Sequence, residues 1–231
     1  MDLKFIGTGG AFEYEYGNSA AWVDFGGKQI LIDAGHSVYP ALRAKNLADK
    51  IDYLLITHLH DDHVGSLSTT ILHHKYLLPQ PRKAQILYPT AAFGDLLYQF
   101  LKHSLLQPED YVDFVSMSFV PGINFIDTTH HHKQGMQTFA YYFETDEELI
   151  MYSGDLGTPE IVFELLDQKP GKKIRVFHEL SFFQTAGVHT YYQQLHKWND
   201  HYEIYGYHAD PRMAPDDNQI KMVADYPELL V

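Results

Sequence analysis

The segment from Thr57 to Gly65 limits what this chain can fold into more than any other, because it reads Thr-His-Leu-His-Asp-Asp-His-Val-Gly. It follows a short apolar run, Tyr-Leu-Leu-Ile, which has the composition of a buried strand. Side chains of an extended chain repeat every second residue, so His58 and His60 point to the same side and can close on one cation. Asp62 and His63 follow where the chain turns toward a helix, and they offer ligands for a second cation. The spacing His-x-His-x-Asp-His therefore predicts a metal site at a strand end.

Other polar residues also follow predicted strands, and each has an alternative interpretation. Asp33 is a ligand, a carboxylate that orients a ligand, or a cap at the strand end. Asp155 is a ligand or part of an ordinary turn. The neighbours His130, His131 and His132 cannot all reach one ion from a strand end, so we expect one of them to do so. For the whole histidine pattern, the alternative is a surface loop without metal.

The hydrophobic pattern predicts alternating strands and helices. Strands are expected at 3–6, 19–25, 28–33, 53–56, 84–88, 114–120, 124–127, 138–144, 149–152, 173–177 and 203–207. Helices are expected at 36–46, 63–78, 89–103, 159–168 and 190–201, the last from a capping box at Thr190. This alternation in both halves implies an α/β fold in which two sheets are covered by helices. Residues 1–231 suit a single domain.

Composition narrows the chemistry. The chain has no cysteine, so metal ligands must be nitrogen or oxygen, which suits Zn²⁺ and also Mn²⁺ or Fe. Its formal net charge is −13 and no basic run occurs, so a broad nucleic-acid surface is not expected. No signal peptide and no apolar stretch of about 18 residues is found, so we expect a cytoplasmic protein that does not contact a membrane.

Taken together, these motifs resemble the ordered metal motifs of the metallo-β-lactamase superfamily. The resemblance runs from residue 3 to about residue 210 and implies an αββα sandwich of two mixed β-sheets flanked by helices, with two metals at one edge of the sheets. His132 is chosen from its cluster because the stretch from His132 to Tyr141 looks like the histidine, turn and small-aromatic strand of the phosphodiesterase members. The implied ligands are His58, His60 and His132 for the first metal, Asp62, His63 and His208 for the second, and Asp155 as a bridge.

Two further stretches look like the ribonuclease Z branch of that superfamily. His178-Glu179-Leu180-Ser181 and His189-Thr190 follow its two histidine motifs in the right order. The resemblance implies that the second histidine, here His189, lies beside the metals and acts on the scissile phosphate. We expect His189, held by Glu179 or a neighbour, to protonate the leaving oxygen, and Asp62 to accept the proton of the water as well as bind metal. Only 22 residues separate His132 from Asp155, which leaves no room for the long arm of many transfer-RNA-cleaving members.

The sequence thus predicts a dinuclear metal-dependent hydrolase. The expected enzyme is a phosphodiesterase that acts on a nucleotide, an RNA end or a small phosphodiester. The attacking hydroxide would come from a water shared by two divalent ions, for which Zn²⁺ is the leading candidate. Transfer RNA as a substrate and a homodimer as the assembly stay open. The alternatives are a lactonase or thioesterase-type hydrolase on the same site, or a module that binds metal without catalysis.

Overall fold

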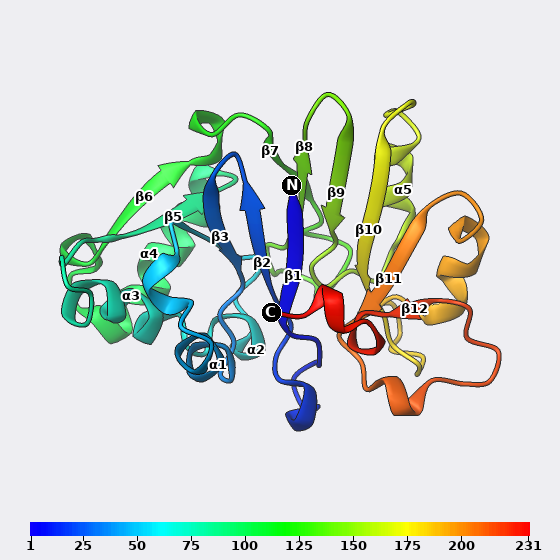
Figure 1. Ribbon diagram of the computed structural model, residues 1–231, viewed down its shortest axis with the longest axis horizontal. Helices are drawn as coiled ribbons and strands as arrows, with labels where there is room; N and C mark the ends of the chain where they lie inside the picture. The colour runs from blue at the N-terminus through cyan, green and yellow to red at the C-terminus, as the bar shows by residue number, and fades with distance from the viewer.

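The computed structural model describes residues 1–231 and contains two six-stranded sheets packed face to face, with helices outside them (Figure 1). The first sheet has the order β1 (Asp2–Gly7), β2 (Ala20–Phe25), β3 (Lys28–Ile32), β4 (Tyr53–Leu55), β5 (Ala84–Tyr88) and β6 (Val112–Ser116). The second has the order β12 (Lys221–Met222), β11 (Glu203–Tyr207), β10 (Lys173–Glu179), β9 (Glu148–Tyr152), β8 (Phe139–Glu144) and β7 (Ile123–Asp127).

Both sheets are mixed, and they are built alike. In the first, β1, β2 and β3 pair antiparallel, and β3 to β6 pair parallel. In the second, β7, β8 and β9 pair antiparallel, and β9 to β12 pair parallel. Parallel strands are covered on both faces and therefore read as continuous apolar runs, as in β4, where neighbouring Leu54 and Leu55 are both buried. The predicted fold class, two mixed sheets flanked by helices, is confirmed.

The helices lie on the outer faces of the sheets. The α-helices are α1 (Val38–Ala44), α2 (Asp61–Val64), α3 (Leu67–Tyr76), α4 (Ala91–Leu105) and α5 (Glu160–Leu166). Short 3-10 helices cover Tyr14–Tyr16, Ala48–Lys50, Pro108–Asp110, Met117–Phe119, Tyr192–Trp198, Pro211–Met213, Val223–Asp225 and Pro227–Leu229. No helix has both the length and the apolar character needed to cross a bilayer.

Aromatic side chains from both sheets meet in the space between them. The Phe5 ring of β1 lies with its centroid 5.1 Å from that of Tyr207 in β11, and Tyr207 stacks on Tyr152 of β9 at 4.9 Å. All three side chains are almost completely buried. Because such rings bury large apolar areas, this contact fixes one sheet against the other and with it the edge where their strands end. The prediction of a single domain stays a prediction.

Four elements differ from the sequence prediction. The strand expected at 114–120 is β6, which ends at Ser116, followed by the 3-10 helix Met117–Phe119. The helix expected at 63–78 is two helices, α2 and α3, because the backbone leaves the helical conformation at Ser66, with φ −113° and ψ 10°, where the Ser66 hydroxyl donates to Gly35 O at 2.7 Å. The capping box predicted at Thr190 is wrong. Tyr191 is the residue that caps Tyr192–Trp198, which is a 3-10 helix. Strand β12 was not expected, because two residues carry no periodic signal.

Candidate metal centre

The histidine segment follows β4 and runs into α2, which lies at the lower edge of the molecule in Figure 1. Residues 56–60 are extended or bent, and α2 begins at Asp61. The turn depends on a close approach of two backbones, because a Cβ on Gly35 would lie 1.9 Å from the carbonyl oxygen of Asp62. Only glycine leaves that space free, so the turn after β3 helps to hold Asp62 and His63 in place.

Three imidazoles and a carboxylate form the first group of the site. Nε2 of His58 lies 3.0 Å from Nδ1 of His60, and Nε2 of His132 lies 3.3 Å from the same atom. The carboxylate Oδ2 of Asp155 is 3.8 Å from His58 Nε2 and 3.9 Å from His132 Nε2. These four donor atoms lie close enough together to hold one ion.

The second group joins two residues of α2 to a loop that follows β11. Nε2 of His63 and Nε2 of His208 lie 3.4 Å and 3.3 Å from Oδ2 of Asp62. The other carboxylate oxygen of Asp155, Oδ1, is 3.3 Å from His63 Nε2 and 3.5 Å from His208 Nε2. Asp155 therefore offers one oxygen to each group. The structure brings together all seven residues that were expected as ligands, and their role as ligands stays a prediction.

Two buried polar atoms at this site have no hydrogen-bond partner, His63 Nε2 and Asp155 Oδ1. A buried polar atom without a partner is costly, and here both atoms are directed at the same small space. Neutral imidazoles and carboxylates are also the ligands that Zn²⁺, Mn²⁺ and Fe²⁺ accept. The residues present thus fit a site that could hold divalent metal ions.

The local charges favour a cation. Burial lowers the pKa of His58 well below its ordinary range, so its ring stays neutral and keeps a free lone pair, as a ligand must. Burial also lowers the pKa of His63, but the charges of Asp155 and Asp33 outweigh it and raise that pKa well above the usual range. Burial raises the pKa of Asp155, but the charges of His208 and His63 have the larger effect and hold that pKa well below its ordinary range. Asp155 therefore stays ionised. The carboxylates therefore impose a negative field where His63 Nε2 points.

Residues behind the ligands hold the rings in orientation. Nδ1 of His63 lies 2.8 Å from Oδ2 of Asp33, and Nδ1 of His132 lies 2.7 Å from the carbonyl oxygen of Val188. Asp33 also accepts hydrogen bonds from the backbone N–H and the hydroxyl of Thr57, at 2.8 and 2.9 Å. Each ring thus donates from Nδ1 and turns Nε2 to the site. For Asp33, the geometry favours the orienting role over direct ligation.

Two of these residues have left-handed backbones, Asp33 with φ 64° and His208 with φ 70°. Residues with a Cβ rarely adopt this conformation, and it costs on the order of 1–3 kcal/mol where it occurs. The N–H of His208 donates to the carbonyl of Thr8 at 2.7 Å, which helps to hold the strained residue. The strained turns, one after a strand of each sheet, direct the Asp33 carboxylate to the back of the His63 ring and the His208 ring to the site.

We expect Asp33→Asn to weaken metal binding by about 10- to 100-fold while the fold is kept. An amide in place of the carboxylate removes the charged acceptor of the His63 Nδ1–H bond without changing the size of the side chain. Competition of the protein with a chromogenic chelator measures the affinity. The control is Asp24→Asn on the exposed side of β2. Unchanged affinity in Asp33→Asn would contradict the orienting role.

His189 and Glu179 form a pair beside the ligands. Nδ1 of His189 lies 3.2 Å from Oε2 of Glu179, while Oε1 of the same buried carboxylate accepts from the N–H groups of Leu156 and Thr190 at 3.0 and 2.9 Å. His189 Nδ1 is also 3.8 Å from Oδ2 of Asp155. Burial lowers the pKa of His189, but the hydrogen bond and charge of Glu179, with Asp155, raise it to about 9. His189 could therefore carry a proton at the edge of the site.

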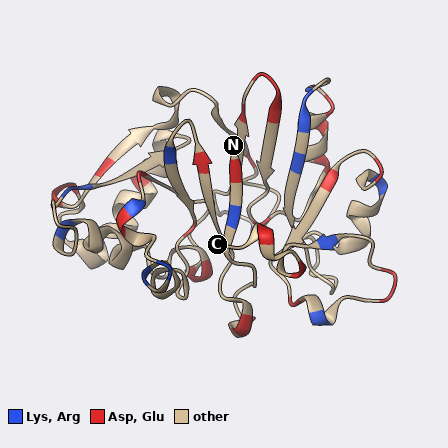
Figure 2. Ribbon diagram, in the orientation of Figure 1, with Lys and Arg blue, Asp and Glu red and all other residues tan.

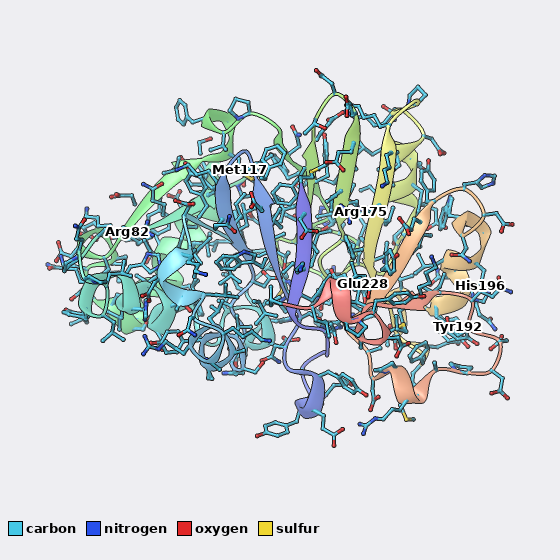
Figure 3. All side chains as sticks on the ribbon, viewed as in Figure 1. Arg82, Met117, Arg175, Tyr192, His196 and Glu228 are labelled. Carbon is cyan, nitrogen blue, oxygen red and sulfur yellow. The ribbon has the colours of Figure 1, made fainter.

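The remaining histidines of the motifs lie elsewhere. His130 is exposed, and His131 contributes backbone bonds, donating to Thr128 O at 2.8 Å and accepting from Gly157 N at 2.5 Å. His73 is a buried packing residue of α3, bonded to Asp49 at 2.6 Å. His196 lies on the outer edge of the molecule, on the Tyr192–Trp198 helix (Figure 3).

An open cleft of about 630 Å³ leads to the site, a size that suits a small ligand. The metal-centre side of its wall includes His60, Asp62, Asp155, His189 and His208. Residues 10–13 of the loop after β1 form a lip of the cleft, and the rest of its lining is Leu59, Asp61, Leu180, Ser181 and Thr185. The sequence analysis missed this lip and the roles of Thr57 and the Val188 carbonyl. A backbone acceptor such as Val188 O has no sequence signal.

The family model and the individual relatives that match this chain carry the same description. The family model described as "Anti-Pycsar protein Apyc1" matches residues 1–224. A protein of that name from Bacillus phage 010DV004 is 30% identical over 217 residues, covering 84% of this chain and 82% of its own. Another, from Bacillus phage vB_BveM-Goe7, is 32% identical over 213 residues, covering 84% and 80%.

Solved structures with the same fold include enzymes of several kinds. A diphosphatase from the PhnP family superposes with a TM-score of 0.69 at 17% identity, covering 95% of this chain and 93% of its own. The short form of human tRNase Z gives 0.63 at 16% identity, covering 95% and 98%, and yeast PDE1 gives 0.63 at 14%, covering 98% and 93%. A metallo-β-lactamase fold protein, YhfI from Bacillus subtilis, also superposes with a TM-score of 0.68 at 16% identity, covering 94% of this chain and 89% of its own, so the predicted fold is confirmed along nearly the whole chain.

Proposed function

The chain belongs to the Anti-Pycsar protein Apyc1 family, and from this premise we propose that it is a metal-dependent phosphodiesterase that hydrolyses a nucleotide or another small phosphodiester. The fold and the histidine and aspartate cluster that could hold metal ions are features of the chain itself. We propose, in addition, the reaction, the substrate, and the number and identity of the metal ions.

One observation carries the proposal: Asp155 presents its two carboxylate oxygens to two separate sets of nitrogen and oxygen donors. Such an arrangement suits two ions held side by side. When bound, a pair of divalent ions lowers the pKa of water and neutralises the charge of phosphate oxygens, which are the two requirements for in-line attack on a phosphodiester. We propose that the bound metal is Zn²⁺, with Mn²⁺ or Fe as alternatives.

The side chains around this pair have the roles that hydrolysis of a phosphodiester needs. Asp62 lines the cleft and would accept a hydrogen bond or proton from the attacking water. His189 also lines the cleft and would give its proton to the leaving oxygen. Glu179 would position the His189 ring through the 3.2 Å bond to Nδ1, leaving Nε2 free to face substrate.

Size and charge support a small substrate rather than a structured RNA. The chain between His132 and Asp155 forms the short β8–β9 hairpin, so no long arm extends there. Lys and Arg positions are scattered over many elements of the ribbon instead of forming one run (Figure 2), and the net charge is −13. A polyanion would find no basic track on such a surface, whereas a single phosphate needs only the metal centre.

Metal analysis and an aryl phosphodiester assay test the proposal. We expect the purified protein to contain a transition metal by mass spectrometry and to hydrolyse bis-p-nitrophenyl phosphate. Treatment with EDTA should abolish this turnover, and adding back Zn²⁺, Mn²⁺ or Fe²⁺ should restore it. Bound metal with hydrolysis of lactones or thioesters alone would identify a different hydrolase. Neither metal nor turnover would leave a binding module.

A further inference from the structure

One hydroxyl closes the loop that carries His189. Oγ1 of Thr185 accepts a hydrogen bond from the His189 N–H at 2.9 Å and donates to the His189 carbonyl at 3.1 Å. Both backbone polar groups of His189 therefore bond to a single side chain, and we call this pair of bonds the Thr185 clamp. Thr185 and His189 both line the metal cleft, so the clamp lies at the site itself.

The residues between Thr185 and His189 form a tight turn that their own conformational preferences do not favour. The Val188 N–H donates to the Thr185 carbonyl at 3.2 Å, and the two residues between them, Ala186 and Gly187, have φ of 52° and 83°. Positive φ at both central positions is typical of a type I′ turn, where Gly, Asn and Asp dominate. Because alanine is unfavourable there, contacts outside the turn must hold it in place.

Two contacts place this turn against the metal centre. A Cβ on Gly157 would lie 1.6 Å from the carbonyl oxygen of Gly187, so the two backbones meet where only glycine leaves room. The carbonyl of Val188 accepts a hydrogen bond from Nδ1 of His132, an expected ligand, at 2.7 Å. The turn is thus fixed relative to the first ligand group.

The chain after His189 and the His189 ring have their own partners. The Thr190 N–H donates to Oε1 of Glu179 at 2.9 Å, and its hydroxyl donates to Leu156 O at 2.5 Å. Oε2 of Glu179 accepts from the ring at 3.2 Å. The backbone of His189 itself bonds only to Thr185. Removing the Thr185 hydroxyl would therefore free the backbone of His189 and leave the other contacts in place.

We infer that Thr185 is a positioning residue for the reaction. By clamping the His189 backbone, it keeps the ring where it gives its proton to the leaving oxygen. The inference rests on the proposed function and adds to it a residue that acts through His189 and not on the substrate. A reacting group that is misplaced by about 1 Å can lose on the order of 10²-fold in rate, so a single hydroxyl can have a large effect.

Thr185→Val and Thr185→Ser test the clamp, because valine keeps the shape of the side chain and serine keeps its hydroxyl. We expect Thr185→Val to keep its metal, since none of the expected ligands lies at 185–189. Its kcat for diphenyl phosphate should fall by about 10- to 100-fold with little change in KM. Bis-p-nitrophenyl phosphate, whose leaving group needs no proton, should lose much less. Thr185→Ser should behave like the wild type on both diesters.

Hydrogen exchange followed by NMR measures the clamp without catalysis. The His189 N–H should be protected in the wild type and in Thr185→Ser. In Thr185→Val it should exchange about 10-fold faster or more, because the hydrogen bond that protects it is lost.

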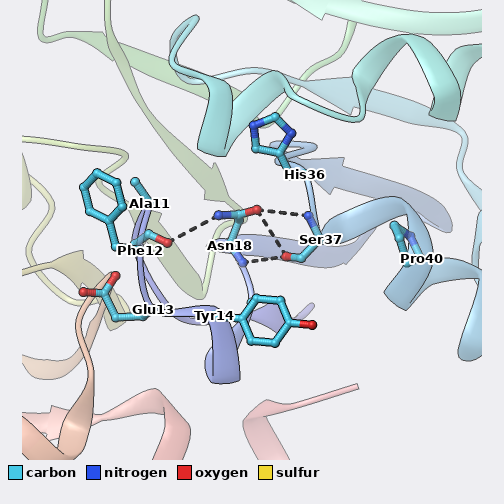
Figure 4. Close-up of a pocket in the computed structure, with 10 residues that line it drawn as sticks. Ala11, Phe12, Glu13, Tyr14, Asn18, His36, Ser37 and Pro40 are labelled. Atoms are coloured by element: carbon cyan, nitrogen blue, oxygen red, sulfur yellow. Dashed lines mark hydrogen bonds between the residues drawn. The ribbon is translucent and has the colours of Figure 1, made fainter.

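Two other hydroxyls that clamp a single residue serve as matched controls. Oγ1 of Thr145 accepts from the Glu148 N–H at 3.1 Å and donates to the Glu148 carbonyl at 3.3 Å, in the β8–β9 hairpin. Oγ of Ser37 accepts from the Asn18 N–H at 2.7 Å and donates to Asn18 Oδ1 at 3.2 Å (Figure 4). Asn18 in turn donates to Gly10 O at 3.3 Å, in the lip of the cleft. Thr145→Val and Ser37→Ala should leave the difference between the two diesters unchanged.

Three results in Thr185→Val would contradict the inference: equal loss on both diesters, a raised KM as the main effect, or loss of metal. The hydroxyl would then contact substrate or support the fold. Unchanged exchange of the His189 N–H would contradict it as well. If the wild type hydrolysed bis-p-nitrophenyl phosphate alone, no proton would reach the leaving oxygen, and the inference would fail while the proposed function stood. Hydrolysis of neither diester by the wild type would remove both.

Discussion

His60→Ala is expected to release bound metal and to lower phosphodiester turnover on the order of 10³-fold, while the protein stays folded. Its Nδ1 lies within 3.3 Å of the donor nitrogens of both His58 and His132, so its loss opens the first ligand group at its centre. The ring is only half-buried, so truncation leaves a small cavity compared with removal of His58, which is completely buried. Mass spectrometry for metal content, circular dichroism and the aryl phosphodiester assay measure the three effects.

The matched control for this substitution is His130→Ala, in the histidine cluster two residues before His132. His130 is exposed and lies outside every group of candidate ligands, so its removal should leave metal content and turnover unchanged. If His60→Ala retained the full metal content and wild-type turnover, the first ligand group would be wrong. Equal losses in both variants would indicate an effect on the shared loop instead of on ligation.

His189→Ala is expected to keep the metal ions and to lower kcat by about 10² to 10⁴-fold, the range typical for loss of a general acid. The effect should depend on the leaving group. A p-nitrophenolate leaves without help, whereas an alkoxide needs a proton, so the loss should be much larger for an alkyl phosphodiester or a nucleotide than for bis-p-nitrophenyl phosphate. KM should change less than kcat, because the metal centre would still hold the phosphate.

Two further variants separate proton transfer from structure. Glu179→Gln keeps the shape of the residue that positions His189 but removes its charge, and it should give a smaller loss with the same dependence on the leaving group. His196→Ala, on the outer 3-10 helix, is the distant histidine control. Loss of metal from His189→Ala would exclude the proton-donor role, because His189 would then be acting as a ligand of the group it forms with Asp155 and His208.

The sequence predicted most of the strands closely, because each is a local apolar run with a turn signal after it. The prediction for 84–88 coincides with β5, and that for 203–207 with β11. Errors occurred where long-range contacts override local pattern. Ser66 lies inside the predicted helix, but its hydroxyl bonds to the carbonyl oxygens of Ala34 and Gly35 and its backbone leaves the helical conformation. Likewise, Thr190 reads as a cap, but its hydroxyl donates to Leu156 O across the site.

For the site, the sequence by itself determined the donor chemistry: histidines and aspartates placed after apolar runs, with no cysteine to compete. The residues alone left Asp155 as a ligand or part of a turn. Its bridging role, and His208 as a ligand, came only from the resemblance to the superfamily. The tertiary structure decided which donors face one another. It placed the two oxygens of Asp155 toward different groups and made the Val188 carbonyl the acceptor for His132. It also set the Thr185 hydroxyl against the backbone of His189. The physical reason is that a ligand type is a property of one residue, whereas a coordination distance of about 2 Å depends on strands more than 100 residues apart being held in register by the core.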